Sequence, residues 1–172
     1  VVGAGSIGLH VVRIAKGFGM DVLAFDVRPN NLIAEVLGFE YAPLEELFRR
    51  ADIVSLHAPY SPATHHMINE ESLKTFKRGA LLINTARGEV VDHAALRDAI
   101  RDRKLRVALD VFAQEPATTT GEFSDPIVQE PGVYGTHHIG ASTDQAQEAI
   151  AGETVRIVQV FKETGQAPNA VN

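Results

Sequence analysis

Three ionisable residues lie in or just after predicted strand ends, and their side chains could carry out acid–base and anion-binding chemistry. They are Arg87, Glu115 and His138, in the segments 84–88, 110–116 and 136–143. Open parallel α/β sheets bind their ligands at the carboxyl ends of the strands. A histidine can exchange a proton near neutral pH, a carboxylate can stabilise an imidazolium, and a guanidinium can bind a carboxylate. Taken singly, each has a plainer interpretation as a surface arginine, a loop acid or a histidine near a helix cap.

A glycine motif at the start of the chain indicates a dinucleotide site. Gly3-Ala4-Gly5-Ser6-Ile7-Gly8 has the G-x-G-x-x-G pattern between a strand and an amphipathic helix. Gly3 permits a tight turn, Gly5 lets the backbone approach a pyrophosphate, and Gly8 lets the helix pack closely on the strand. Amides around Ser6 and Ile7, with the positive end of the helix dipole, would bind the phosphates. The pattern alone could also be a structural turn, so its context decides.

Asp26 supplies that context. It follows the second predicted strand, 23 residues after Gly3, where an acidic side chain can accept hydrogen bonds from an adenosine ribose. The same carboxylate would repel a 2′-phosphate, which favours NAD over NADP. Arg28 could in principle receive such a phosphate, but Asp26 lies at the strand end itself. The remaining alternative for Asp26 is an ordinary solvated loop acid.

Short apolar runs alternate with helical patterns, which predicts βαβ units and a parallel sheet covered on both faces. Strands are predicted at 1–2, 21–25, 53–56, 80–84, 107–110 and 133–136, with a short one at 39–41. Helices are predicted at 7–18, 31–37, 44–50, 70–76, 92–102 and 143–164. Asp92, and Ser142 or Thr143, are the expected helix caps, and Gly165 is expected to end the last helix. The fold class is therefore α/β, a Rossmann-type doubly wound parallel sheet in three layers.

Domain boundaries follow from the same pattern. The first strand, Val1 and Val2, is shorter than the usual length of about five residues, so we expect an N-terminally truncated NAD-binding domain over residues 1–165. Residues 166–172, which include Pro168, are expected to form a connector that leads away from this domain. Residues 112–132 are expected to form a long loop without regular structure, of a kind that is often functional.

Composition disfavours several classes of function. The chain has 172 residues, enough for one domain, and a net charge of −6 that argues against a nucleic-acid partner. Without cysteine it has no disulfide and no thiolate metal site, which is compatible with the cytoplasm. No apolar stretch is long enough to span a membrane, and no signal peptide opens the chain. We therefore expect a cytoplasmic protein without membrane contact.

The histidines outside these motifs do not predict a metal site. His65 and His66, with His57, could be taken for a ligand cluster, but adjacent histidines rarely point at one ion, and no carboxylate stands at a ligand-like spacing. We therefore expect no metal, and a polar loop at His65 and His66.

Four motifs, in order, resemble the D-isomer-specific 2-hydroxyacid dehydrogenases over nearly the whole chain. They are the glycine motif, His57-Ala58-Pro59, the Arg-Gly-x-x-Val-Asp segment 87–92, and His138-Ile139-Gly140. One departure is visible, because His137 stands where a proline commonly precedes the catalytic histidine. His138 directly precedes Ile-Gly, as the family histidine does, so catalysis is assigned to His138. In an extended segment His137 would point the opposite way.

The resemblance implies an NAD-dependent oxidoreductase that acts on a D-2-hydroxy acid or a 2-keto acid. His138 would take the hydroxyl proton, Glu115 would orient and stabilise its imidazolium, and Arg87 would hold the substrate carboxylate. Asp110 resembles the family residue that faces the nicotinamide carboxamide. The residues expected to bind the cofactor are Gly3, Gly5, Ser6, Ile7, Gly8, Asp26, His57, Ala58, Pro59, Thr64, Thr85, Ala86, Arg87, Asp110, His138 and Gly140.

The resemblance also bears on partners. Family members are typically dimers, so a homodimer is expected, with a small 2-hydroxy or 2-keto acid as the partner molecule. The alternative is an NAD-responsive protein-binding module, because corepressors of this fold can keep the same three residues. In the family a second, substrate-binding lobe closes over the cofactor, and the resemblance implies that residues 166–172 connect to this missing lobe. We therefore expect this chain alone to bind NAD but to turn over substrate poorly.

Overall fold

The computed structural model describes residues 1–115, 123, 125–168 and 170. They form two compact units, Val1–His137 and His138–Asn172, and each is described by itself. Residues 116–122 and 124 of the predicted long loop, and residues 169, 171 and 172 of the predicted connector 166–172, lie outside the described residues.

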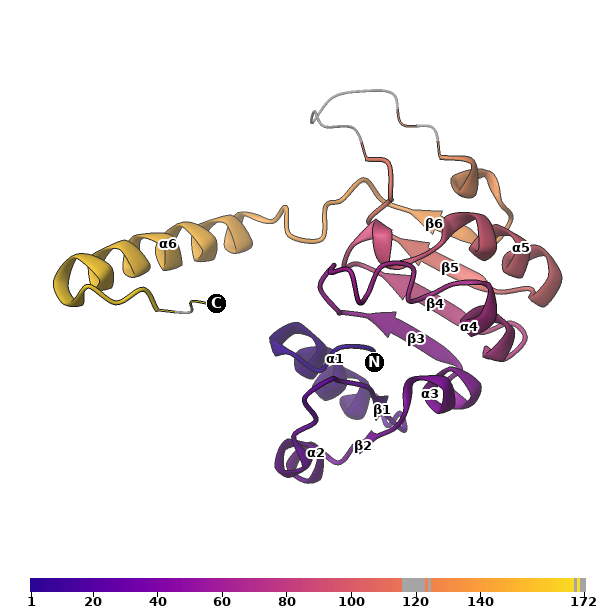
Figure 1. Cartoon of the computed structure of the whole chain (residues 1–172), viewed down its shortest axis with the longest axis horizontal. Coiled ribbons are helices and arrows are strands. Elements are labelled where there is room, and N and C mark those ends of the chain that lie inside the picture. Colours follow the sequence, from indigo (N-terminus) through magenta and orange to yellow (C-terminus); the bar gives the residue numbers. More distant parts are fainter. Residues whose placement is uncertain (116–122, 124, 169, 171–172) are drawn as a thin grey trace. The chain divides into compact units, whose positions relative to one another are not determined.

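The first unit alternates strands and helices along the chain (Figure 1). Its strands are β1 Leu23–Ala24, β2 Glu40–Tyr41, β3 Ile53–Leu56, β4 Leu81–Asn84, β5 Arg106–Leu109 and β6 Val133–Gly135. Its α-helices are α1 Ser6–Gly17, α2 Asn31–Leu37, α3 Leu44–Arg50, α4 Glu70–Thr75 and α5 His93–Arg103. Each of these elements was predicted within two residues of its bounds. The first predicted strand is reduced to bridges at Val2.

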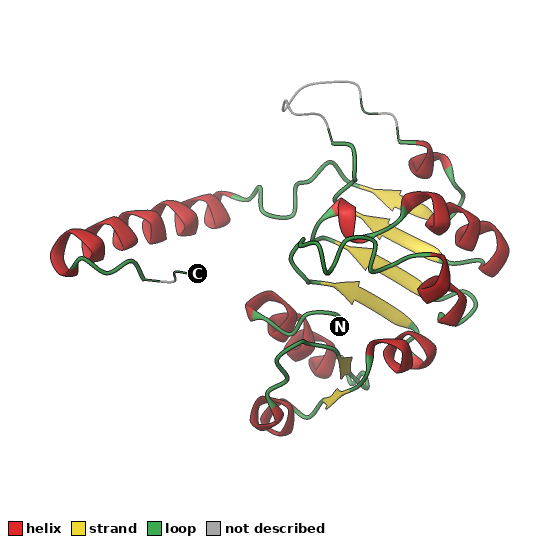
Figure 2. Cartoon of the chain, viewed as in Figure 1, coloured by secondary structure: helices red, strands yellow, loops and turns green. Residues whose placement is uncertain are grey.

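The strands of this unit form a parallel sheet. β3, β4, β5 and β6 pair in that order, and their four arrows point the same way in Figure 2, so the residues that follow them lie along one edge. Val2 forms parallel bridges to Phe25 and to Leu56, and it thereby joins β1 and β2 to β3. The order becomes β2-β1-Val2-β3-β4-β5-β6, which is the doubly wound arrangement that the sequence predicts.

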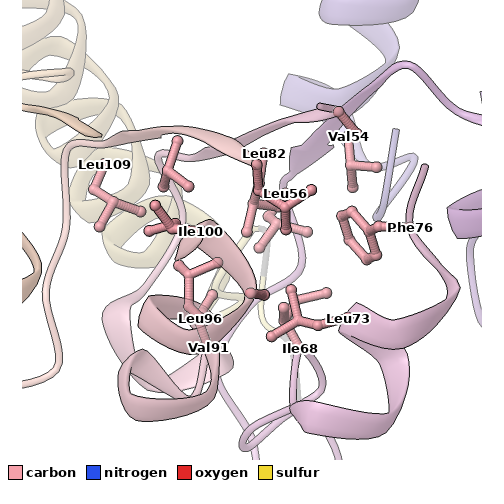
Figure 3. Close-up of a cluster of buried hydrophobic side chains, with 14 of the residues drawn as sticks. Val54, Leu56, Ile68, Leu73, Phe76, Leu82, Val91, Leu96, Ile100 and Leu109 are labelled. Carbon is pink, nitrogen blue, oxygen red and sulfur yellow. The ribbon is translucent and has the colours of Figure 1, made fainter. Parts of the chain in front are cut away.

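Helices flank the sheet in two groups. The larger core lies between β3 to β6 and α3, α4 and α5, and Figure 3 shows Ile68, Leu73, Phe76 and Leu96 meeting strand residues such as Leu82. Burying each such side chain contributes about 1.5–3 kcal/mol relative to exposure. The second cluster, formed largely by α1, α2 and β1, comprises Val12, Val22, Ala24, Ala34 and Phe39.

Local polar signals set the helix ends. The Asp92 side chain accepts hydrogen bonds from the amides of Ala94 and Ala95, so the predicted N-cap of α5 is confirmed. Asn69 caps α4 with the reciprocal bonds of a capping box to Ser72. Lys104 ends α5 with a φ of 57°, in the left-handed region that usually favours glycine or asparagine.

The segment predicted to lack regular structure contains one short helix. η2, a 3-10 helix over Pro126–Gln129, contradicts that prediction for these residues. Its cap explains it, because Asp125 accepts from the Ile127 amide and Pro126 fixes φ at a position where no amide is needed. A second 3-10 turn, η1 Gly88–Val90, follows β4.

The second unit is built on one long helix, α6 Asp144–Thr164. Thr143 caps it by accepting from the Ala146 amide, and Gly165 ends it in the left-handed conformation, as the sequence predicts. Within the described residues, no helix of either unit is long and apolar enough to cross a lipid bilayer.

Glu130 ties the end of η2 to helix α5. Its carboxylate is buried and accepts from Arg97 Nε at 3.1 Å and from Arg101 Nε at 3.0 Å. The hydrogen bond from Arg101, followed by that from Arg97, holds the pKa of Glu130 below its ordinary value of 4.5. A lowered carboxyl pKa means that the pair stabilises the fold above pH 4.5, and that this stabilisation is lost as the pH falls through the folded-state value.

We therefore expect Glu130→Gln to lower the urea midpoint of unfolding at pH 7, and the difference from wild type to shrink toward pH 3. Glu35→Gln, at an exposed position on α2, is the matched control and should leave the midpoint unchanged. A difference that stays constant over this pH range would show that the charge of Glu130 contributes nothing.

Candidate functional site

The glycine motif forms a tight turn against the loop that follows β3. Gly3 has a φ of 91°, and a Cβ built on it would lie 2.8 Å from the His57 carbonyl carbon and from the Ala58 amide nitrogen. A Cβ on Gly8 would lie 1.9 Å from the Gly3 oxygen. These two positions therefore exclude any side chain. The contact also brings the glycine motif and the His57 segment, far apart in sequence, to the same place.

The start of α1 has the properties of an anion site. A Cβ on Gly5 would meet no atom of the described chain within 4 Å, so the turn leaves its backbone open to approach. Gly5 is the N-cap of α1 and provides no side-chain cap, and the first turn contains no acidic residue. The amides and dipole of a helix start bind phosphates. The turn and helix start thus fit the pyrophosphate of a dinucleotide.

Asp26 is built into the same turn. Its Oδ2 accepts from the Ala4 amide at 2.8 Å, and its Oδ1 accepts from the Arg28 amide at 2.8 Å. The first bond holds the glycine turn to the end of β1, a role that the sequence pattern did not reveal. The half-buried carboxylate remains at the edge where an adenosine ribose is expected, while the Arg28 side chain is exposed.

The segment after β3 is stabilised by its own side chains. His57 Nε2 lies 2.8 Å from Ser55 Oγ, and burial lowers the pKa of His57 below its ordinary value of 6.5. The Thr64 hydroxyl donates to the Pro59 carbonyl at 2.7 Å and accepts from the Ser61 amide at 2.8 Å. Thr64 thus fixes the loop that starts with His57, Ala58 and Pro59.

Arg87 lies on a loop that a buried asparagine organises. Asn84, the last residue of β4, has no exposed surface; its Nδ2 donates to the Arg87 carbonyl at 2.9 Å and its Oδ1 accepts from the Ala86 amide at 3.0 Å. The Arg87 side chain is exposed, and its Nη1 donates to the Ala86 carbonyl at 2.6 Å. Thr85 is also exposed. A guanidinium held on such a loop can bind a carboxylate.

Glu115 lies on the loop after β5, and its Oε1 accepts from the Phe112 amide at 2.7 Å. Asp110, at the start of this loop, is buried and accepts from the Thr136 hydroxyl at 2.5 Å. Thr136 directly follows β6, so this bond joins the ends of two adjacent strands. The first unit thereby brings Arg87, Asp110 and Glu115 to the carboxyl ends of adjacent strands.

His138, Ile139 and Gly140 belong to the second unit, ahead of α6. The φ of His138 is 58°, so the expected extended backbone does not continue through this residue. A left-handed conformation is uncommon for residues other than glycine, although histidine adopts it more often than most. The extended geometry therefore cannot be what separates the directions of His137 and His138.

Sequence reasoning missed Asn84 and Thr136 as parts of this site. Both carried a signal, because each is a polar residue at the end of an otherwise apolar strand.

Among the described residues, no group of three or more histidine, aspartate or glutamate side chains is placed to hold a metal ion. The rings of His65 and His66 stack, with centroids 3.9 Å apart.

The chain matches one protein family over most of its length. The sequence profile described as "D-isomer specific 2-hydroxyacid dehydrogenase, NAD binding domain" matches residues 1–140. A glyoxylate reductase of Korarchaeum cryptofilum is 40% identical over 173 residues, covering 100% of this chain and 51% of that protein. A D-3-phosphoglycerate dehydrogenase of Methanocaldococcus jannaschii is 37% identical, covering 100% of this chain and 32% of that protein. The chain thus spans about half, or less, of the length of these relatives.

A solved structure agrees with this match. The D-lactate dehydrogenase of Aquifex aeolicus, complexed with NAD and lactic acid, superposes with a TM-score of 0.82 at 40% sequence identity. The superposition covers 94% of this chain and 52% of that one.

The half-buried position of His57 generates a prediction about its charge. Because burial lowers its pKa below 6.5, His57 should be neutral at pH 7. The corresponding stabilisation is fully present above pH 6.5 and is lost as the pH falls through the folded-state value. NMR titration of the ring signals, with His57→Gln to assign them, checks this. A midpoint at or above 6.5 would contradict the role given to burial.

Proposed function

This chain belongs to the D-isomer-specific 2-hydroxyacid dehydrogenase family as its NAD-binding domain, and from that premise we propose that it forms part of an oxidoreductase. The reaction is hydride transfer between NAD and a D-2-hydroxy acid or the corresponding 2-keto acid. The observation that carries the proposal is the first unit's carboxyl edge, where the glycine turn, Asp26 and the Arg87 and Glu115 loops all lie. The relatives reported above carry the names of reductases and dehydrogenases, which favours an enzyme over a corepressor-like binding module.

The cofactor would be held along this edge. The α1 start around Gly5, Ser6 and Ile7 would bind the pyrophosphate, and Asp26 would bind the adenosine ribose. The segments His57 to Pro59, Thr85 to Arg87 and Asp110 would line the nicotinamide half, with Thr64 fixing the first of them and Gly140 following the catalytic histidine. When bound, NAD supplies the acceptor or donor of the hydride.

The chain's own residues would handle the substrate. The Arg87 guanidinium binds the carboxylate and, in the reducing direction, polarises the carbonyl. The His138 imidazole takes the proton of the substrate hydroxyl as oxidation proceeds and returns it in reduction. In the proposed active form, the Glu115 carboxylate would orient that imidazole and stabilise its charged form.

The substrate itself is chosen by groups outside this chain. The segments 115–118 and 138–143 resemble D-3-phosphoglycerate dehydrogenase, whereas the relative from Korarchaeum cryptofilum is named a glyoxylate reductase. A screen of the full-length protein with NADH against 3-phosphohydroxypyruvate, glyoxylate, hydroxypyruvate and pyruvate tests the proposal. Reduction of one keto acid far above the others identifies the substrate, and reduction of none of the four overturns the proposed activity.

The proposal extends to the form of the protein. We infer that this chain is part of a longer polypeptide, in which it is joined to a substrate-binding lobe. We also infer that the protein forms a homodimer and lies in the cytoplasm. The chain alone should bind NAD but reduce keto acids poorly. Efficient turnover by the isolated 172 residues would contradict the inference that catalysis needs a second lobe.

We expect His138→Ala in the full-length protein to lower kcat about 10²–10⁴-fold, the range lost when a general acid–base group is removed. His137→Ala is the matched control and should leave kcat close to that of wild type, because catalysis is assigned to the histidine that directly precedes Ile139 and Gly140. Steady-state NADH oxidation measures both. Near-normal turnover of the His138 variant would falsify its assignment as the base.

Asp26 variants should separate cofactor choice from support of the turn. Asp26→Asn keeps an acceptor for the Ala4 amide but removes the charge, so NAD should bind about tenfold or more weaker and NADP relatively better. Asp26→Ala also removes the support of the turn, so both cofactors should bind weakly. Fluorescence titration gives the dissociation constants. An unchanged ratio of NAD to NADP affinity in the asparagine variant would exclude the ribose contact.

A further inference from the structure

Gly88 lies in backbone contact with the loop after β5. A Cβ built on it would lie 2.1 Å from the Phe112 carbonyl carbon, 2.3 Å from the Ala113 amide nitrogen and 2.4 Å from the Phe112 oxygen. Real Cβ atoms essentially never approach other heavy atoms within 3.0 Å. All three atoms are backbone, so no side-chain rotation can relieve the overlap. Any larger residue at position 88 must therefore displace one of the two loops.

The two sides of this contact carry two of the proposed functional residues. Gly88 directly follows Arg87 in the chain. On the other side, Phe112 donates through its own amide to Glu115 Oε1 at 2.7 Å, so the residue whose carbonyl group lies against Gly88 also binds the carboxylate. A shift of either loop would change the distance between the guanidinium and the carboxylate.

Each loop is also fixed on its far side. The Arg87 loop is bound by Asn84, and the strands beneath are joined where the Asp110 amide donates to the Asn84 carbonyl at 3.0 Å. The Phe112 ring packs edge-on against His93, whose Nδ1 lies 2.9 Å from Asp125 Oδ2. Neither loop can therefore yield without breaking buried contacts.

We propose that Gly88 is a positioning residue, whose contact with the Phe112–Ala113 peptide sets the spacing between Arg87 and Glu115. The inference rests on the proposed dehydrogenase function and adds a residue that touches neither cofactor nor substrate. At Gly88 the neighbouring backbone leaves no room for a side chain larger than hydrogen, whereas at Gly5 the described chain leaves room for one. Misplacing a group by about 1 Å can cost a reaction about 10²-fold.

The test uses Gly88→Ala in the full-length protein, with Gly17→Ala as control. Gly17 ends α1, and a Cβ there meets nothing within 4 Å in the described chain. Gly88→Ala should lower kcat/KM for the keto acid about 10–100-fold, because the groups that meet the substrate are misplaced, and should weaken NAD binding far less than that, because the glycine turn and Asp26 keep their contacts. Gly17→Ala should match wild type in both measurements.

A double-mutant cycle with Arg87→Ala separates positioning from general damage. If Gly88 acts through the placement of Arg87, adding Gly88→Ala to the Arg87→Ala variant should lower kcat/KM by less than about threefold more, since the effects of coupled residues are not additive. Full multiplication of the two losses, or a Gly88→Ala enzyme with wild-type kcat/KM, would overturn the proposal.

Two further results have defined meanings. If Gly88→Ala shows no cooperative melting and no NAD binding, Phe112→Leu replaces it, because this change loosens the same peptide without a backbone clash; the same cycle and the same limits then apply. If the wild-type protein reduces no 2-keto acid, the proposed function fails, whereas an active wild type with an unaffected Gly88 variant refutes the positioning role alone.

Discussion

The hydrogen bonds on both sides of Val2 join the two parts of the sheet. The carboxyl edge of the first unit, where the cofactor is proposed to bind, depends on these bonds. The Val2 amide donates to Ser55 at 2.9 Å, and the Gly3 amide donates to Phe25 at 2.8 Å. Phe25 directly precedes Asp26, and Ser55 lies two residues before His57. The same short segment therefore aligns the glycine turn, the ribose-binding candidate and the His57 loop. In a parallel sheet this alignment makes one edge, where open α/β proteins bind nucleotides.

Glycine at this edge is required by two different constraints. At Gly3, Gly8 and Gly88 the neighbouring backbone occupies the volume of a side chain, so the requirement comes from the fold. At Gly5 the described chain imposes no such limit, and the proposed approach of the pyrophosphate to the turn would account for the glycine there. A sequence pattern records both as the same letter. Only the three-dimensional structure separates the glycines that pack the domain from Gly5, which is proposed to admit the pyrophosphate.

Much of the fold was predictable, because its strands are short apolar runs and several of its helices begin at polar caps. β3, with Val54 and Leu56 buried, and α5, capped by Asp92, illustrate both signals. The role of Asp26 in the turn escaped prediction because its bond to Ala4 joins segments far apart in the sequence, at a spacing that a single sequence does not reveal. Asn84 and the helix at Pro126 carried local signals, a polar residue at a strand end and an Asp-Pro cap, that were not recognised. The left-handed conformation of His138 has no such signal in its residue type.

The Asn84 amide faces inward and is bonded through both its oxygen and its nitrogen to the loop it precedes. The loop's shape is therefore maintained from beneath, while Thr85 is exposed on it. A substitution at such an outward position leaves the hydrogen bonds of Asn84, and therefore the backbone of the loop, in place. A division of this kind allows related chains to diversify in what they recognise while their architecture stays constant.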